Sequence, residues 1–267
     1  MSFLLDCFWP WRQRGLIAQL ARREVHARYR QSALGLAWVA LTPLLMLGVY
    51  TLVFRHIMRV RWPGAVDESN LDFALRLYAG LAVFAFFAEC VNRAPGLILE
   101  QPNLVKKVVF PIELLPWVSA ASAGVGLGVS GLLLLGLNGW VHGGLPLSAL
   151  ALPLAWLPLL PLVLGLSWLL AGVGTYVRDV GQVLGMAMSA LMFLSPIFYP
   201  VEALPEAVRA WMGLNPLAGV ITDTRAVLAG AWPDWGRWAL ALAAHSLLAL
   251  AGAWFFRRVR VGFADVV

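Results

Sequence analysis

Charged side chains are scarce in this chain of 267 residues: only 13% are Asp, Glu, Lys or Arg, whereas a soluble domain carries about 25%. Lysine is the rarest of them, because Lys106 and Lys107 are the only two among 20 basic residues. The mean hydropathy is +0.78 and 61% of the residues are hydrophobic. These values exclude an ordinary soluble protein and predict an integral membrane protein.

Cysteine and histidine are also few. Cys7 and Cys90 are too few for a disulfide framework and lack metal-binding spacing. The four histidines are scattered, and the sequence contains neither a metal-binding motif nor a catalytic triad. The phosphate-binding motif GxxxxGK[ST] is missing. We therefore expect a protein that is not an enzyme and that holds no nucleotide, cofactor or metal of its own.

Acidic residues are too dispersed for two other functions. A membrane-embedded transferase acting on lipid-linked sugars needs a general base or a carboxylate cluster, and a proton-coupled carrier needs acids along its spans; the 14 acidic residues form neither. The net charge of +6 does not predict nucleic-acid binding, since in a membrane protein the positions of the arginines matter more than their sum. The N-terminus, "MSFLLDCFWPWRQRG", has no features of a cleavable signal peptide.

Long apolar runs divide the chain into six candidate transmembrane helices, since a helix needs roughly 20 apolar residues to cross about 30 Å of hydrocarbon. Arg76 and Glu89 interrupt the second run, and "NGWVHGGLP" (138–146) provides the turn between the third and the fourth. We predict an all-α membrane protein with a single domain, 1–267. Its predicted spans are residues 31–54, 71–91, 114–137, 147–177, 180–199 and 238–256.

The distribution of arginine predicts the orientation. An even number of spans places both termini on one side of the membrane. If that side is the cytoplasm, thirteen of the 20 basic residues are cytoplasmic, as the positive-inside rule requires. Arg55, Arg59 and Arg61 oppose this bias, but the arginine-rich flank before the first span outweighs them. We predict a multi-pass protein of the cytoplasmic (inner) membrane with both termini in the cytoplasm.

Both lysines lie in "NLVKKVVFP" (103–111), in the predicted cytoplasmic loop between the second and third spans. Apolar residues recur there at helical spacing, and Pro102 and Pro111 separate the segment from either span. One interpretation is a basic loop that only anchors topology. The other is a short helix that presents an apolar face to a partner.

Two further segments are predicted to be helices outside the spans. Residues 12–30 form an amphipathic pattern, typical of a helix on the inner membrane surface or of a basic flank that sets topology. Residues 200–237 are too polar to span and read as two short outer helices, with Pro205 and Pro216 in first turns and Asn215 as a cap. These outer helices form either a lid or a passive interfacial loop.

Small residues and one charge pair are the remaining signals within the spans. Ala120, Gly124 and Gly128 share one helix face, and Gly181, Gly185 and Ser189 share another; internal packing is the preferred interpretation and a dimer seam the alternative. Glu89 and Arg93 are four residues apart, either as a functional pair or as a local interfacial pair. Most of the 13 tryptophans are expected to anchor span ends, and some to contact sugar rings.

Four blocks of the sequence together resemble the permeases of type-2 ABC exporters for polysaccharides. They are "RREVHARYRQSALGLAWVALTPLLMLGVYTLVF" (22–54), "NLVKKVVFPIELLP" (103–116), "SPIFYPVEALPEAVRAWMGLNPLAGVITDTRAVLAG" (195–230) and the terminal "RRVRVGFADVV" (257–267). The proline- and tryptophan-rich start and the many arginines after the first span depart from the family's pattern. A type-2 permease for small amphiphiles or drugs is the alternative within the same fold.

The resemblance implies partners and site residues. It implies a homodimer paired with two copies of a separate ATPase, which binds ATP and Mg, and a substrate of undecaprenyl-linked polysaccharide such as O-antigen, capsule or teichoic acid. It favours the lid interpretation of the outer helices. The residues expected to couple to the ATPase are Asn103, Leu104, Lys106, Lys107, Val108, Phe110, Pro111, Arg22, Arg23, Glu24, Arg28, Tyr29 and Arg30. The candidates for the glycan path or a gate are Trp38, Glu89, Arg93, Tyr199, Asn215 and Arg225.

Overall fold

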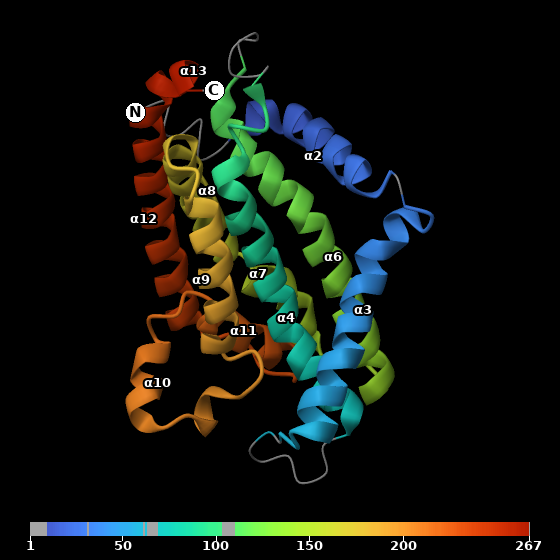
Figure 1. Ribbon diagram of the computed structural model, residues 1–267. Coiled ribbons are helices and arrows are strands. Elements are labelled where there is room, and N and C mark those ends of the chain that lie inside the picture. Colours follow the sequence, from blue (N-terminus) through green and yellow to red (C-terminus); the bar gives the residue numbers. More distant parts are fainter. Residues whose placement is uncertain (1–9, 31, 61, 63–68, 103–109, 267) are drawn as a thin grey trace.

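The computed structural model describes residues 10–30, 32–60, 62, 69–102 and 110–266. Within these residues the chain is helical, with turns and no strand, which confirms the predicted all-α class. The long helices run side by side as a bundle (Figure 1). Short helices lie at its two ends, which we call the α2 end, where α2 and α13 lie, and the α11 end, where α10 and α11 lie.

The described helices have the following bounds. The α-helices are α2 (Arg14–Tyr29), α3 (Trp38–Thr51), α4 (Asn70–Arg93), α6 (Leu115–His142), α7 (Leu152–Ala155), α8 (Leu159–Tyr176), α9 (Val180–Leu194), α10 (Glu206–Met212), α11 (Ala218–Leu228), α12 (Trp235–Val259) and α13 (Phe263–Val266). A π-helical segment, η3 (Leu52–Ile57), continues α3. The 3-10 turns are η1 (Trp11–Gln13), η2 (Gly35–Ala37), η4 (Ala94–Gly96), η5 (Ile112–Leu114), η6 (Leu147–Ala151), η7 (Val201–Ala203) and η8 (Arg260–Gly262).

Among the described residues, five helical segments are long and apolar enough to cross a membrane. They are Gly35–Ile57, Asn70–Gly96, Ile112–His142, Leu147–Tyr176 and Trp235–Gly262. They overlap the predicted first, second, third, fourth and sixth spans, and most extend beyond the predicted bounds by a few residues. The fourth contains a break, because the turn at residues 156–158 separates α7 from α8.

The predicted fifth span, 180–199, contains a shorter helix than expected. α9 has 15 residues, which corresponds to about 22 Å at 1.5 Å per residue. It ends at Leu194 because the next residues are Ser195 and Pro196, and proline lacks the amide hydrogen that would continue the helix. The structure therefore supports five spans by length and leaves the sixth to the proposal below.

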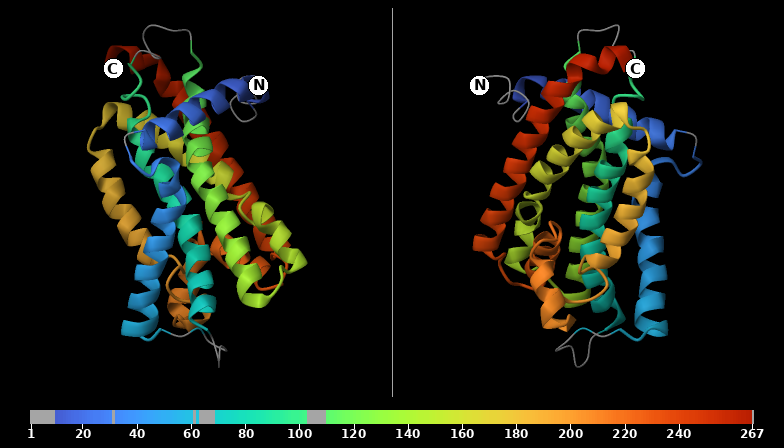
Figure 2. Two further views of the ribbon diagram at one scale, coloured as in Figure 1. Left: turned by 90° about the vertical axis from the view of Figure 1, so that its right-hand side faces the viewer. Right: turned by 60° about the vertical axis from the view of Figure 1, so that its left-hand side comes forward.

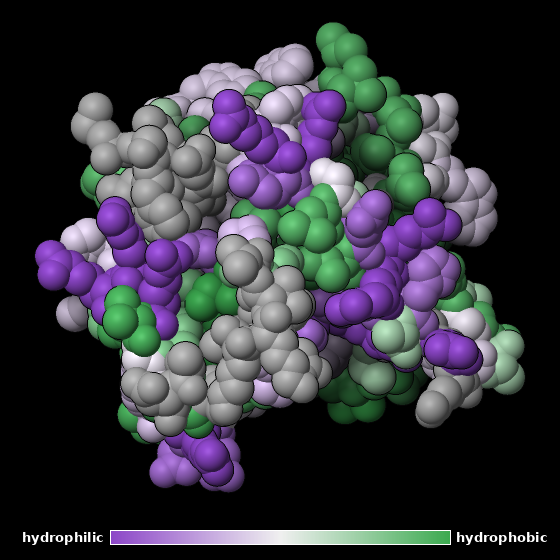
Figure 3. All heavy atoms as spheres, turned by 90° about the horizontal axis from the view of Figure 1, so that it is seen from above, coloured by the Kyte–Doolittle hydropathy of each residue, from purple (hydrophilic) through white to green (hydrophobic). Residues whose placement is uncertain are grey.

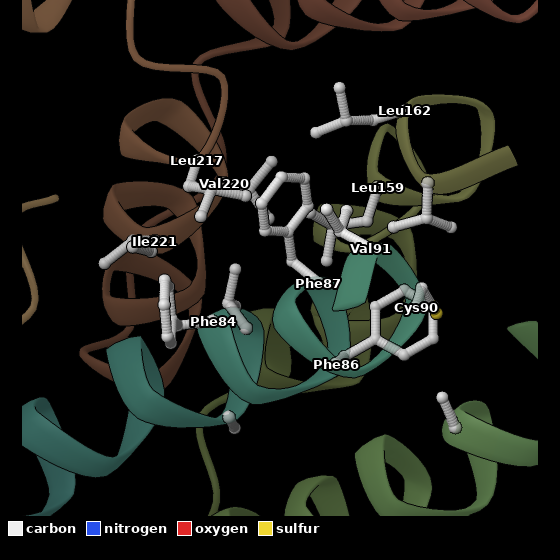
Figure 4. Close-up of a cluster of buried hydrophobic side chains, with 14 of the residues drawn as sticks. Phe84, Phe86, Phe87, Cys90, Val91, Leu159, Leu162, Leu217, Val220 and Ile221 are labelled. Carbon is white, nitrogen blue, oxygen red and sulfur yellow. The ribbon is translucent and has the colours of Figure 1, made fainter. Parts of the chain in front are cut away.

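The core is built around α4, whose apolar residues are buried on most sides. Phe84, Phe86 and Phe87 of α4 are at most 8% exposed. Their neighbours come from α8 and α11, as Figure 4 shows for Leu159 and Ile221. α3 contrasts with α4. In the most apolar 18-residue stretch of each span, only 6% of the residues are buried for α3, against 72% for α4. α3 therefore stands at the margin of the bundle, as the two views in Figure 2 show.

Glycine brings helices together at other positions than those predicted. A Cβ atom on Gly165 of α8 would lie 2.8 Å from the backbone of Ala249 of α12, so only glycine allows these helices to approach as they do. A Cβ atom on Gly124, Gly128 or Gly181 would meet no atom of the described residues of other helices within 4 Å. The same is true of Gly185. Internal packing was therefore the wrong interpretation for these four glycines.

The two helices predicted between residues 200 and 237 are α10 and α11. α11 is more than a surface element, because Val220 and Ile221 are buried against the core. Asn215 acts slightly earlier than expected: its side-chain Oδ1 accepts a hydrogen bond from the backbone N–H of Leu217 at 2.9 Å, just before α11 begins. α11 is therefore packed into the bundle as well as lying at its end.

Candidate functional site

The α2 end holds the first group of candidate residues, joined by two crossed ion pairs. Arg28 of α2 lies 2.6 Å from Glu89 of α4, from Nη2 to Oε1. Glu24 of α2 pairs with Arg93 of α4. The expected pair between Glu89 and Arg93 within α4 is thus replaced by partners from α2. Each helix carries its acid and base four residues apart, so the two helices match in register.

α2 also buries an apolar face against the protein. Ile17 and Ala21 are 9% and 6% exposed and pack on Leu114 and Val118 around the start of α6. The predicted segment 12–30 is helical over Arg14–Tyr29, and part of its apolar face packs on α6. The other basic residues of the predicted coupling set in this region, Arg22, Arg23 and Arg30, are exposed.

The predicted coupling segment lies mostly outside the described residues, which exclude Asn103, Leu104, Lys106, Lys107 and Val108. The residues on both sides of the segment are described, and they pack against the rest of the protein. On one side Pro95 packs against Gly174 of α8, where a Cβ atom would come within 2.5 Å. On the other side Phe110 packs on the apolar core, while Pro111 is exposed.

Glu113 is a functional candidate that sequence reasoning missed. It follows the predicted coupling segment, is 5% exposed and pairs with Arg260 of η8. Its backbone carbonyl accepts a hydrogen bond from the Trp168 indole at 3.1 Å. The sequence signal that could have identified Glu113 is a single acid between two apolar runs. A carboxylate buried in such a place requires a charged partner. These two contacts hold the stretch around Glu113 against α8 and against η8, near the end of the chain.

The surface of the α2 end is rich in hydrophilic side chains (Figure 3). The exposed residues of α2 in this region include Arg22, Arg23 and His26, and Arg257 and Arg258 end α12. Such a basic surface suits anionic lipid headgroups or an acidic protein partner.

Trp38 joins Glu89 and Arg28 around a small cavity of about 200 Å³ between α2, α3, α4 and α6. The side-chain hydroxyl of Ser122, which also lines this cavity, is buried and has no hydrogen-bond partner among the described residues. The cavity is otherwise mostly apolar. Three of the six candidates for a path or gate, Trp38, Glu89 and Arg93, thus lie in one region.

The other three candidates gather at the α11 end, around the turn at residues 195–199 that follows α9. The side-chain amide of Asn215 donates to Ser195 Oγ at 3.0 Å. The hydroxyl of Tyr199 donates to the carbonyl of Phe193 at 2.8 Å. Arg225 of α11 donates to the carbonyls of Pro196 and Ile197 at 2.6 and 2.7 Å. The six candidates therefore form two groups at opposite ends, and the described structure places them on no single path.

Arg225 is the most constrained of these residues. It also donates to the carbonyl of Arg76 at 2.9 Å, and its guanidinium lies 4.5 Å from the ring of Trp62. Burial, followed by the charge of Arg76, lowers the pKa of Arg225 to about 9. It therefore remains charged at neutral pH, and the carbonyls and the indole ring stabilise that charge. Trp62 was not among the predicted site residues.

The described residues contain no group of three or more His, Cys, Asp or Glu side chains that could hold a metal ion. Paired charges do occur. Asp223 of α11 pairs with Arg237 of α12 at 2.6 Å, and Asp72 of α4 lies 3.2 Å from His142 of α6. These pairs join helix ends and have no arrangement typical of catalysis.

Comparison with known proteins places this arrangement in a family. The O-antigen export system permease protein RfbA of Myxococcus xanthus is 30% identical over 262 residues, 96% of this chain and 97% of that protein. A protein of the same name from Klebsiella pneumoniae is 21% identical over 94% of this chain and 95% of its own length. The capsule polysaccharide export inner-membrane protein CtrC of Neisseria meningitidis is 24% identical over 77% of this chain and 76% of its own length. The sequence profile described as ABC-2 type transporter matches residues 15–228, and the chain therefore belongs to the ABC-2 type transporter family.

Proposed function

We propose that this chain is the permease subunit of an ATP-driven exporter that moves a lipid-linked polysaccharide, of the O-antigen type, across the cytoplasmic membrane. The observation that carries the proposal is similarity over almost the full length, 96% of this chain and 97% of its relative, to an O-antigen export permease. The capsule export protein matches a smaller share, 77% of the chain. Polysaccharide is the substrate class common to the names of these relatives, and O-antigen is the member we propose.

We propose six spans, with α9 as the short fifth one, and both termini in the cytoplasm. The basic surface of α2 and the last residues of α12 support this orientation, because positive charge favours the cytoplasmic side. A cysteine at Arg59, in a background lacking Cys7 and Cys90, should react with an impermeant thiol reagent added outside intact cells. Labelling only after the membrane is disrupted would reverse the orientation.

The energy source is proposed to be a separate ATPase that binds ATP and Mg, since the sequence contains no phosphate-binding loop. We propose that two ATPase copies dock on the α2 end, at residues 103–111 and at the exposed arginines of α2. The anchored flanks at Pro95 and Glu113 support this position. Because both flanks are anchored, a displacement of the segment between them would be transmitted to α8 and α12.

The assembly is proposed to be a homodimer that carries an undecaprenyl-linked glycan between its subunits. The open glycine faces of α6 and α9 support a second copy, since the chain itself leaves Gly124, Gly128, Gly181 and Gly185 without a close neighbour among the described residues. The lipid tail of the carrier would remain in the surrounding bilayer.

The proposal is tested by deleting the gene in its native organism. We expect the surface polysaccharide to be lost, lipid-linked polymer to accumulate inside, and the intact chain to restore export. A matched strain with a partner ATPase that cannot hydrolyse ATP should show the same defect. Normal surface glycan in the deletion strain would contradict the proposal, and lost resistance to amphiphilic drugs with normal glycan would favour a small-molecule exporter.

A further inference from the structure

A cavity of about 400 Å³ lies at the α11 end, between the first turns of α4, the last turns of α6, and α11. Cavities that bind small molecules measure about 300–1,000 Å³. Two carboxylates and two arginines line it, Asp72, Glu202, Arg76 and Arg225, and so does His142, which lies 3.2 Å from Asp72. None of the functions argued above uses this space, although Arg225 forms part of its wall.

The wall disfavours an anion. The Nε, Nη1 and Nη2 atoms of Arg225 each donate to a backbone carbonyl, and its planar face lies over Trp62. The guanidinium therefore has little capacity left for a phosphate or carboxylate. The wall also has no excess of arginines over carboxylates, since Asp72 and Glu202 balance Arg76 and Arg225.

The remaining groups offer both donors and acceptors. Trp62 is 7% exposed, and its indole N–H is buried without a hydrogen-bond partner among the described residues. Asn138 is 2% exposed and its amide N–H donates to the carbonyl of Leu228 at 3.1 Å, which leaves Oδ1 as an acceptor. Glu202 is exposed at the margin. An unpaired buried donor is costly, so an occupant that accepts from Trp62 would relieve that cost.

We propose that this cavity is a binding subsite for a neutral, hydroxyl-rich saccharide unit. A hydroxyl group both donates and accepts. One sugar hydroxyl oxygen accepts from Trp62 Nε1, while others donate to Asn138 Oδ1 and to the Glu202 carboxylate. In an exporter of polysaccharide, which this inference takes from the proposed function, the subsite contacts the glycan on the outer side. It gives the glycan a contact within one subunit, away from the seam between copies.

The test uses the purified full-length chain in lipid nanodiscs, without its ATPase. Saturation-transfer NMR would be recorded with D-mannose, D-galactose, L-rhamnose and N-acetyl-D-glucosamine, and with inorganic phosphate as a competitor. At least one sugar should bind saturably, with a Kd of about 1–10 mM, and phosphate should not displace it.

Two substitutions each remove one polar feature of the cavity wall. Trp62→Phe removes the N–H but keeps a ring under Arg225, and Glu202→Gln removes the charge. Each should weaken sugar binding about fivefold or more, the usual result of losing one hydrogen bond to a polar ligand. Trp211→Phe and Glu206→Gln are the matched controls, since both residues are exposed and lie outside the cavity, and they should leave binding unchanged.

Three outcomes overturn the inference: no sugar binds saturably to folded protein, phosphate displaces the sugar, or the two cavity substitutions match their controls. Failure here is distinct from failure of the proposed function. If sugars do not bind but gene deletion still abolishes surface glycan, the export function stands and the subsite is removed. If sugars bind but deletion leaves the surface glycan intact, the export function falls and the cavity remains a saccharide site.

Discussion

The two ends of the bundle are held by different chemistry. At the α2 end, carboxylates and arginines pair across helices, as Glu24 does with Arg93 and Glu113 with Arg260. The α11 end also has charge pairs between helices, such as Asp223 with Arg237. Its turn at residues 195–199 is held differently, because Asn215 donates to Ser195 Oγ and Arg225 donates to the carbonyls of Pro196 and Ile197. Ion pairs fix whole helices relative to one another, whereas bonds to carbonyls fix the path of one turn. The first suits a docking platform, and the second holds one turn in a single path.

The largest effect is expected when one partner of the most buried pair at the α2 end is removed. Glu113 is 6% exposed in its side chain, and Arg260→Met would leave that carboxylate without its charge partner. Stranding a buried charge costs about 3–5 kcal/mol, so the thermal unfolding midpoint of the purified chain should fall strongly.

Two variants make this measurement specific. Arg258→Met removes an exposed arginine whose guanidinium lies 5.3 Å from the ring of Trp254, and it should cost only about 0.5–1 kcal/mol. Adding Glu113→Gln to Arg260→Met removes the stranded charge and should recover most of the loss. Equal midpoints for Arg260→Met and Arg258→Met would show that the buried pair does not hold the α2 end.

The matching change at the α11 end is Arg225→Lys. A lysine keeps the charge but cannot donate in a fixed fork to three carbonyls. We expect a loss of about 2–3 kcal/mol, and faster hydrogen exchange confined to residues 195–200. Arg209→Lys is the control, because a single nitrogen of Arg209 bonds the carbonyls of Glu202 and Leu204 and one ammonium can replace it. Unchanged exchange in Arg225→Lys would mean that the turn is held without its guanidinium.

The sequence predicted where helices run better than it predicted what they contact. Apolar runs and prolines depend on neighbours in the chain, so α4, α6 and α12 appeared within a few residues of their observed bounds. The length of α9 was missed because the hydrophobic run continues past Pro196, although the helix does not.

Contacts between distant residues were not readable in the same way. Glu89 has Arg93 four residues away in the sequence, yet it pairs with Arg28 of another helix. Gly124 and Gly165 both lie in apolar helices, and only the crossing of α8 and α12 makes one of them indispensable. Trp62 gave no signal, since its role depends on Arg225, far along the chain. Periodicity identifies a face, but the packing of the whole chain determines its partner.

The coupling segment extends the comparison from the chain to its partner. If residues 103–111 dock on an ATPase, apolar anchors should outweigh charges, because interface energy concentrates in a few buried side chains. Leu104→Asp should cost about 2 kcal/mol of binding and reduce co-purification of the ATPase. Lys106→Gln with Lys107→Gln should do less. Phe110→Asp is a poorer probe, since Phe110 packs on the chain's own core. Loss of assembly only in the lysine variant would mean that docking depends on charge.

The smallest effect is expected at the pair between Arg28 and Glu89. Both side chains are partly exposed, 36% and 28%, so solvent screens their attraction and each single substitution should cost about 1 kcal/mol or less. Reversing the pair, Arg28→Glu with Glu89→Arg, keeps the attraction but places each new charge beside the second pair, Glu24 and Arg93. Arg28→Glu alone places two acids next to each other. It should lower the unfolding midpoint more than Glu89→Arg alone or the double reversal. The double reversal should recover part of the unfolding midpoint and of ATPase stimulation by the permease. A double variant no better than Arg28→Glu alone would show that the pairs do not act as a matched register between α2 and α4. Docking of α2 would then depend on the apolar contacts of Ile17 and Ala21.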